Sequence, residues 1–461
     1  MADKILIIES TMQYREIWFE VKEELNNLGY DVELINPKKY YNFGLVDLEA
    51  SEIEIGLRGM FPFEPSINRF YISKSKDHNL TELYYRRYLT YWVKRIQNEK
   101  IVLVIAPVAP HRIFDVSLYE ACKLESIKYV SITHSVIKTR FLIDDYIRTD
   151  SGLYKNIKNI EKNIDDELLN IICKCRGEYN LAIPKYEKNN IKEARLFYLN
   201  KIKKIKKLNK FWTNLKNTNH IINGGGLNAF QFVSYQFRKE LELKFLKIKY
   251  NRLTKKVDLF KTKYVYFPLM YQPEETSYPT GGYFNNQLLI ADMLTSTLNK
   301  DTKIVIKEHP SQFNRALYGD LARLPSFYNA LASNKNIIFC PMSYNQFDLI
   351  DNSEMVATIS GTAGFEAYCR GKKVTHFGKS WFSGVSNCHF FETIDGLKKF
   401  MEQPVTQLSA DNIYDELKNI LIYGVDTVCD ESDEKIYGKP TGTDVHNLKE
   451  VLLDYVKKNN K

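Results

Sequence analysis

Residues 355–367 read MVATISGTAGFEA, and this stretch decides the fold class. Residues 355–359 are of the buried type and predict a strand, residues 360–364 are small and predict a tight turn, and a helix is expected after them. Short β-branched runs alternate with longer helical patterns in this way from the first residues of the chain onward. The alternation is typical of a parallel sheet with crossover helices, so we predict an α/β protein.

The predicted strands fall into two series. A helix that ends near Gly29 separates the first two strands, which is a Rossmann-like opening, and the second series repeats the same architecture. The first series comprises residues 4–8, 31–35, 101–105 and 128–132, and the second comprises 264–267, 303–307, 336–340, 355–359 and 374–377. We therefore predict two Rossmann-like domains that face a central cleft, where doubly wound folds bind ligands.

The length of 461 residues exceeds what one hydrophobic core usually supports. We place the first domain at residues 1–260, with a basic helical insertion at about 155–260, and the second at 261–440. Residues 441–461 contain a last amphipathic piece, which we expect to pack back across the first domain as a helix.

The net charge of +9 is unevenly distributed. Residues 185–263 hold 21 Lys and Arg against five Asp and Glu, a local charge of +16 that leaves the remainder at −7. Such a concentration requires an anionic partner or extensive solvation. The early apolar run at residues 5–8 is too short for a signal peptide or a membrane span, and the seven scattered cysteines lack metal or redox spacing. We expect a cytoplasmic protein with reduced thiols.

Residues 303–310, KIVIKEHP, form a buried-type strand that ends abruptly in charged residues and proline. Lys307 supplies a point charge and His309 a donor for phosphate oxygens, while Pro310 fixes the turn that presents them. The alternative is a surface strand end with solvated charges.

The small-residue turn quoted first precedes a helix N-terminus, which presents backbone N–H groups and partial positive charge. Ser360 and Thr362 add hydroxyl donors, and Gly361 allows a phosphate to approach closely. Glu366, about one turn further, is a candidate to bind a ribose diol, or else a capping or helix-dipole carboxylate. Because this turn and residues 303–310 end nearby strands of one predicted sheet, we expect both to converge on one nucleotide phosphate.

A polar loop follows the predicted strand at residues 264–267 and carries Gln272 and Glu274. Its position suits contact with a base, a sugar or an acceptor. The alternative is that Pro268 and Pro273 simply shape a turn.

Three metal or phosphate motifs are absent from the sequence, namely Asp-x-Asp, HExxH and GxxxxGK[ST]. We therefore expect chemistry without a metal and without a resident cofactor. Charge on a leaving phosphate then has to be offset by the helix N-terminus, Lys307 and His309.

Parts of the second half resemble the bacterial capsule polysaccharide biosynthesis family, which includes β-Kdo transferases. The stretches that carry the resemblance are residues 267–274, 307–310 and 360–366. The resemblance is specific from about residue 264 to 390 and general before that. It implies a GT-B fold and a nucleotide-sugar donor, most simply a CMP-activated acidic keto sugar such as Kdo.

The resemblance also implies roles for individual residues. By this analogy His309, Ser360 and Thr362 hold the CMP phosphate, and Glu366 holds the ribose. A further segment, residues 139–145, is similar to the family, and its Arg140 is a candidate to pair with the carboxylate of an acidic sugar.

The first domain should supply the acceptor site and a catalytic carboxylate or base. The candidates near predicted strand ends are Glu9, His111, Asp115 and His134. A carboxylate can act as nucleophile or as base, whereas a histidine is better suited to removing a proton from an acceptor hydroxyl. For each of them the alternative is a structural hydrogen bond.

The basic stretch places Ile202, Ile205, Leu208 and Phe211 on one face of a predicted helix with lysines between them. Such a helix can lie on the anionic inner face of the plasma membrane, where a lipid-linked glycan acceptor would be found. The alternative is a packed interdomain helix with a solvated lysine face. No nucleic-acid reader motif accompanies the basic residues, so we expect no nucleic-acid partner.

These features together predict a metal-independent glycosyltransferase that moves a sugar from a nucleotide-sugar donor onto a growing capsular or lipopolysaccharide glycan. Two alternatives on the same fold are a nucleotide-sugar 2-epimerase and a polyol-phosphate transferase. A third is a non-catalytic partner in capsule assembly.

Overall fold

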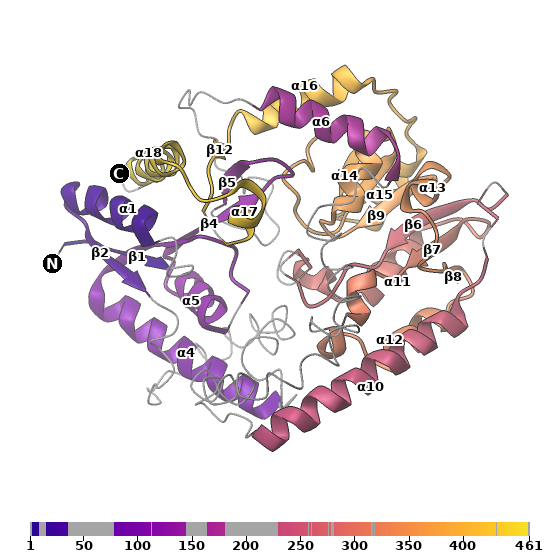
Figure 1. Ribbon diagram of the computed structural model, residues 1–461, viewed down its shortest axis with the longest axis horizontal. Helices are drawn as coiled ribbons and strands as arrows, with labels where there is room; N and C mark the ends of the chain where they lie inside the picture. Colours follow the sequence, from indigo (N-terminus) through magenta and orange to yellow (C-terminus); the bar gives the residue numbers. More distant parts are fainter. Residues whose placement is uncertain are drawn as a thin grey trace, which may run out of the picture.

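The computed structural model describes most of both predicted domains. The described residues are 2–8, 15–35, 78–111, 113–143, 164–179, 229–256, 258–259, 261–274, 276–277, 281–314, 317, 319–429 and 431–459. Within them the chain forms two six-stranded sheets with helices on both faces, which confirms an α/β fold with two Rossmann-like domains (Figure 1). Glu9 and the predicted basic helix with Ile202 and Phe211 lie outside the described residues.

The first sheet has the strand order β12-β5-β4-β3-β1-β2. Its strands are β1 (Lys4–Ile8), β2 (Asp31–Ile35), β3 (Ile101–Ala106), β4 (Lys128–His134), β5 (Thr139–Ile143) and β12 (Val425–Asp426). β1 to β4 are parallel, whereas β5 pairs antiparallel with β4 and β12 antiparallel with β5. The four parallel strands were expected, and the antiparallel edge was not.

Helices cover both faces of the first sheet. They are α1 (Arg15–Asn27), α4 (His78–Glu99), α5 (Ile113–Leu124) and α18 (Gly442–Asn459). Successive strand residues point to opposite faces, so Ile5 and Ile7 pack with α1 and α18 while Leu6 and Ile8 pack with α4 and α5. This two-sided burial explains why the strand is apolar at every position instead of at every second one.

The second sheet is parallel throughout and has the order β11-β10-β9-β6-β7-β8. Its strands are β6 (Tyr264–Pro268), β7 (Lys303–Lys307), β8 (Ile337–Phe339), β9 (Met355–Thr358), β10 (Lys373–His376) and β11 (Cys388–Phe390). On one face lie α10 (Ala229–Leu253), α11 (Gln287–Thr297), α12 (Pro325–Ser333) and α15 (Ile394–Glu402). On the other lie α6 (Asp165–Arg176), α13 (Gln346–Asp351), α14 (Thr362–Cys369) and α16 (Ala410–Leu421).

Within the described residues, three 3-10 helices lie in loops of the second domain, and one short helix lies near the C-terminus. They are η6 (Gly282–Asn285), η7 (Pro310–Phe313), η8 (Gly319–Leu321) and α17 (Glu431–Tyr437). No helix among the described residues has the length and apolarity needed to cross a bilayer. All seven cysteines are free thiols.

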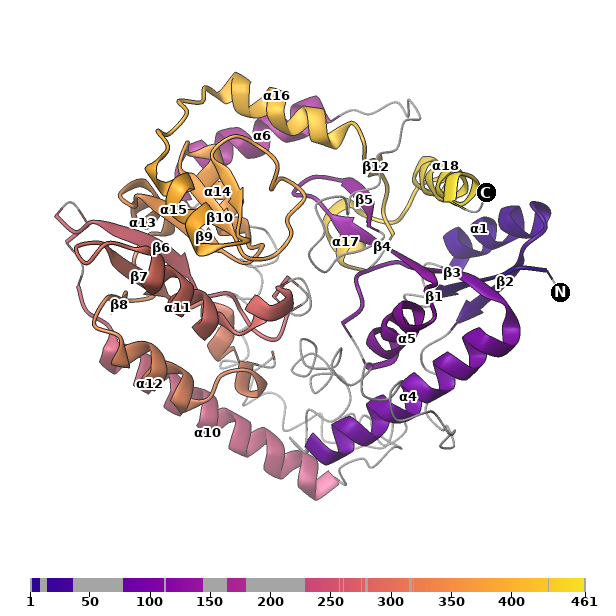
Figure 2. The same ribbon diagram turned by 180° about the vertical axis from the view of Figure 1, so that it is seen from behind.

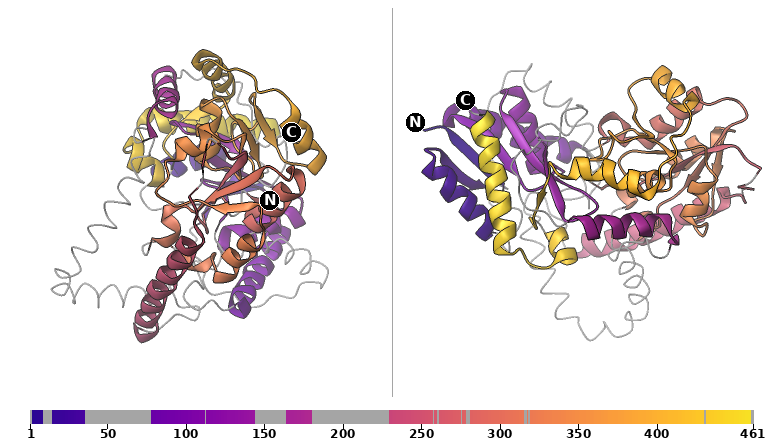
Figure 3. Two further views of the ribbon diagram at one scale, coloured as in Figure 1. Left: turned by 90° about the vertical axis from the view of Figure 1, so that its right-hand side faces the viewer. Right: turned by 90° about the horizontal axis from the view of Figure 1, so that it is seen from above.

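The chain crosses between the two domains in ways that differ from the expected boundaries. Helices α6 and α10 come from the stretch placed in the first domain, yet both pack on the second sheet (Figure 2). In the reverse direction β12 already joins the first sheet at residues 425–426, ahead of the expected boundary at residue 440. The last helix, α18, then packs beside α1, so that both chain ends lie on the first domain (Figure 3).

Candidate functional site

The ends of β7 and β9 carry the two predicted phosphate-binding motifs. Both strands flank β6 in one parallel sheet, so their carboxyl ends lie at the same edge. The loop that follows β6 runs between them. At one end the Leu269 amide donates to the Lys307 carbonyl (2.9 Å), and at the other the Ser360 hydroxyl donates to the Thr276 carbonyl (2.6 Å). The loop therefore ties both motifs into one surface at the sheet edge.

His309 adopts one defined tautomer in the turn after β7. Its Nδ1 atom accepts the backbone N–H of Ser311 (3.1 Å), which caps η7, and Pro310 is the first residue of that helix. Burial, with the nearby charges of Lys307 and Arg323, lowers the pKa of His309 to about 4. The imidazole is therefore neutral at physiological pH with its proton on Nε2, which makes it a hydrogen-bond donor but not a cation.

Contacts with Thr358 of β9 fix the start of helix α14. Gly361 is the N-cap of α14, and its amide donates to the Thr358 hydroxyl (3.2 Å). Thr362 is exposed at the first position of the helix, while Ser360 is half-buried. A Cβ at Gly364 would lie 2.9 Å from Thr358 Cγ2, so only glycine lets α14 pack this closely against β9.

Of four other predicted binding residues, two are buried and two are exposed. Lys307 is buried and its ammonium donates to the Tyr344 carbonyl (2.7 Å), so that it holds the loop after β8. Glu366 is also buried and accepts the side-chain amide of Gln346 (2.6 Å). Glu274 and Pro310 are exposed, and the Glu274 carboxylate accepts the Thr276 hydroxyl (3.3 Å).

Gln272 belongs to a buried polar network beneath the site. Its side chain donates to the Asn285 carbonyl (2.5 Å) and accepts from Arg323, which in turn forms an ion pair with Glu308 (3.2 Å). The Glu308 carboxylate also accepts the Tyr328 hydroxyl (2.7 Å). Because Glu308 precedes His309, the network supports both the loop after β6 and the turn after β7. Sequence reasoning missed it, since Arg323 lies in a loop without a motif.

A cavity of about 550 Å³ adjoins the turn that carries His309. Its volume is in the range of small-molecule sites. The lining residues come from α10 and the residue that follows it, from η7 and from the loop after β8, namely Lys247, Asn251, Thr254, Pro310, Phe313, Pro341, Met342 and Ser343.

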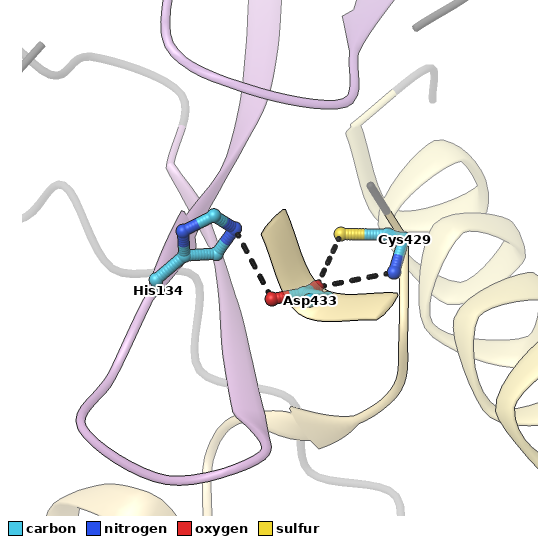
Figure 4. Close-up of side chains that lie close together, drawn as sticks. All are labelled: His134, Cys429 and Asp433. Atoms are coloured by element: carbon cyan, nitrogen blue, oxygen red, sulfur yellow. Dashed lines mark hydrogen bonds and ion pairs between the residues drawn. The ribbon is translucent and has the colours of Figure 1, made fainter. Parts of the chain in front are cut away.

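In the first domain His134 lies at the end of β4 and faces Asp433 of α17. Its Nε2 atom lies 3.7 Å from Asp433 Oδ1, and the Asp433 carboxylate also accepts the backbone N–H of Cys429 (3.2 Å; Figure 4). The side chain of His134 keeps 34% of its surface exposed, whereas Asp433 is buried at 2%. A buried carboxylate thus faces a partly exposed imidazole.

Arg140 is the fixed cation of this cluster. It is buried and binds Asp433 through Nε (3.1 Å) and Nη2, while Nη1 donates to the Ile137 carbonyl (2.6 Å). The expectation that Arg140 pairs with a substrate carboxylate is therefore wrong, because Asp433 already occupies its guanidinium.

The ligand atoms of His134, Cys429 and Asp433 lie within 4.8 Å of one another, a spacing that a metal ion could bridge. However, both Asp433 oxygens already accept hydrogen bonds from Arg140, whose charge would repel a cation. The charge of Arg140 therefore disfavours a metal ion in this cluster.

The remaining first-domain candidates have structural contacts. The backbone N–H of His111 donates to the buried Asp115 carboxylate (3.1 Å), which caps the start of α5. Nδ1 of His111 donates to the Ala109 carbonyl (2.8 Å). These contacts correspond to the structural alternative for both residues.

Residues 183–388 match the family described as capsule polysaccharide biosynthesis protein, a span that includes every predicted donor-site residue. The family resemblance is thereby confirmed for this region. No curated protein matches the chain in sequence.

Solved structures share only a distant likeness with the chain. The Thermosulfurimonas dismutans KpsC beta Kdo 2,7 transferase is 11% identical with a TM-score of 0.32, over 98% of this chain and 100% of that one. The beta Kdo 2,4 transferase of the same KpsC is 12% identical with a TM-score of 0.31, over 77% and 88%. A Methanocaldococcus jannaschii UDP-GlcNAc 2-epimerase is 13% identical with a TM-score of 0.23, over 91% and 100%. At such values these similarities carry no inference about activity.

Proposed function

Because residues 183–388 match the capsule polysaccharide biosynthesis protein family, we propose that this chain is a GT-B glycosyltransferase that extends a bacterial surface glycan. One observation carries the proposal. The turn with His309 and the start of α14 meet at one sheet edge, joined by the loop after β6. Helix N-termini and neutral imidazole N–H groups are both suited to phosphate oxygens, so this edge supports a nucleotide-sugar donor site.

The donor is a CMP-activated acidic keto sugar such as Kdo, as the family resemblance implies. In our proposal Nε2 of His309 donates to the nucleotide phosphate, together with backbone N–H groups at the start of α14. Lys307 contributes its charge from beneath the turn, where its ammonium is bound to the Tyr344 carbonyl. These donors stabilise the negative charge that develops on the leaving CMP, and no step requires a metal.

On the acceptor side we assign His134 as the base that removes the proton from the attacking hydroxyl. Asp433 is a positioning residue, because its carboxylate, which Arg140 holds in place, lies beside Nε2 of the neutral imidazole and leaves Nδ1 to accept the proton. Asp433→Asn keeps the shape of the side chain and removes its charge. It should therefore lower kcat and change the pH profile while leaving KM for the donor unchanged.

The experiment that tests the proposal is CMP release from CMP-activated keto sugars, measured with and without a glycan acceptor. We expect release that depends on the acceptor, and a loss of about 10²–10⁴-fold in kcat for His134→Ala, the range of general base catalysis. Nucleotide affinity of that variant should equal that of the wild type.

Other outcomes of this assay would replace the proposal. A converted sugar nucleotide in the absence of acceptor would identify a 2-epimerase, and turnover of a CDP-glycerol donor a polyol-phosphate transferase. Donor binding without turnover on any acceptor would identify a non-catalytic assembly partner.

A further inference from the structure

Helix α10 has two apolar faces, and among the described residues only one of them is packed. Leu243, Leu246 and Tyr250 are buried, and the last two belong to the core of the second domain. On the other side four large apolar side chains are exposed in succession: Phe237 (65%), Leu241 (51%), Phe245 (61%) and Ile248 (50%). Figure 2 shows α10 along the outer edge of this domain.

The spacing of the exposed residues makes them one stripe. Separations of four, four and three residues place them within about a quarter of the helix circumference at 3.6 residues per turn. The buried residues Leu243, Leu246 and Tyr250 lie on the opposite side. A single exposed apolar residue is ordinary, but an aligned stripe on a soluble domain marks an interaction surface.

Positive charge surrounds the stripe. The residues of α10 that reach the surface between positions 237 and 252 include five cations, Arg238, Lys244, Lys247, Lys249 and Arg252, and two carboxylates, Glu240 and Glu242. Both carboxylates are paired within the helix, Glu242 with Arg238 (3.6 Å) and Glu240 with Lys244 (3.1 Å). The stripe therefore carries an excess of cations at its margins.

We propose that this stripe seats the protein on an anionic lipid surface. The four apolar side chains enter the boundary between headgroups and acyl chains, while the flanking lysines and arginines contact lipid phosphates. The inference rests on the exposure and charge of α10 and does not depend on the proposed glycosyl transfer.

A second copy of the chain fits the same face less well. A two-fold contact would bring the cations of both copies into one seam, and lysine is depleted from such interface cores. Four side chains are also few for the roughly 800 Å² that each partner of a stable dimer buries.

The buried face of α10, opposite the stripe, contacts the candidate donor site. On this face the Tyr250 hydroxyl donates to the Cys340 carbonyl (2.6 Å) and accepts the Glu308 amide (2.9 Å), next to His309. A protein seated through α10 would hold this site near the lipid surface, where a lipid-linked acceptor is concentrated.

The test is flotation of the full chain with vesicles of phosphatidylcholine alone or with about one third phosphatidylglycerol, at low and raised salt. We expect binding to the anionic vesicles, and this binding should weaken at raised salt, because salt screens the attraction between the protein's cations and the lipid phosphates. Phe237→Ser with Phe245→Ser should weaken this binding at least about tenfold, since it removes apolar area from the boundary. Phe19→Ser, at an aromatic residue of α1 that is 45% exposed, is the matched control and should bind as the wild type does.

Folding is checked by the thermal midpoint, which none of these exposed substitutions should shift appreciably. Phe237→Trp with Phe245→Trp should bind at least as tightly as wild type, because indole favours the membrane interface. Equal binding of wild type and the double serine variant would overturn the proposal. So would a dimer in light scattering that the serine variant dissociates, since the stripe would then be a protein interface.

Discussion

Replacing Arg323 with methionine tests whether the buried polar network holds the candidate donor site together. The Arg323 guanidinium is fully buried, pairs with Glu308 through Nε (3.2 Å) and donates to the Met270 carbonyl (3.0 Å). In Arg323→Met the Glu308 carboxylate stays buried without its cation. Removing one partner of a buried pair in this way costs about 3–5 kcal/mol, so we expect a loss of that size in the free energy of unfolding.

The assay is urea unfolding of four proteins: wild type, Arg323→Met, Glu308→Gln and the double variant. The double variant lacks both charges, and it should be at least about 1 kcal/mol more stable than Arg323→Met alone. Lys261→Met, which breaks an exposed pair with Asp258 (3.7 Å), is the control and should cost less than about 1 kcal/mol. An Arg323→Met variant as stable as this control, or strictly additive losses in the double variant, would show that Arg323 and Glu308 do not stabilise each other in the core.

Three further predictions concern single positions. Gly364→Ala should destabilise the chain by about 1–3 kcal/mol in urea unfolding, because its Cβ would press on Thr358, whereas Gly384→Ala, with open space around it, should be neutral. Burial lowers the pKa of His309 from 6.5 to about 4. Between these two pH values the unfolded chain therefore binds the proton more readily than the folded chain does. The stability of wild type relative to His309→Gln should therefore rise with pH between about 4 and 6.5 and be flat above. The Lys373 ammonium donates to the Phe400 (2.8 Å) and Met401 (2.8 Å) carbonyls at the end of α15. Lys373→Met removes these hydrogen bonds and should lower the free energy of unfolding by about 1–3 kcal/mol, which a lower thermal midpoint would reveal.

The parallel strands were predictable because they are buried on both faces. Strands such as β1 and β7 are short apolar runs bounded by turns, and the structure has them at the expected residues. β11 and β12 were missed because they are edge strands of only three and two residues. β5 was missed because it pairs antiparallel with β4 directly after it, without the crossover helix that the alternating pattern predicts. The position of β12 depends on β5, a partner far along the chain, and no local signal encodes such a partner.

In the candidate site, too, some residues could be predicted from the sequence and others could not. His309 and Gly361 could be found because a motif at a strand end has a local chemical meaning. The partner of Arg140 is Asp433, 293 residues away in the sequence. Neither segment contains a local sequence pattern that predicts the other as its partner. The same holds for Arg323, whose charge is used inside the core and not at the surface where a loop arginine is expected.

In the proposed function, the carboxyl edge of the second sheet binds the nucleotide of the donor through His309. Calorimetric titration of CMP, CDP, UDP and GDP into wild type, His309→Ala and His446→Ala tests this binding, and His446, which is exposed on α18, serves as control. We expect CMP to bind most tightly, and His309→Ala alone to weaken it by about 1–3 kcal/mol, the size of a lost hydrogen bond to a charged group. Tighter binding of UDP would contradict the CMP assignment, and unchanged affinity in His309→Ala would contradict the site itself.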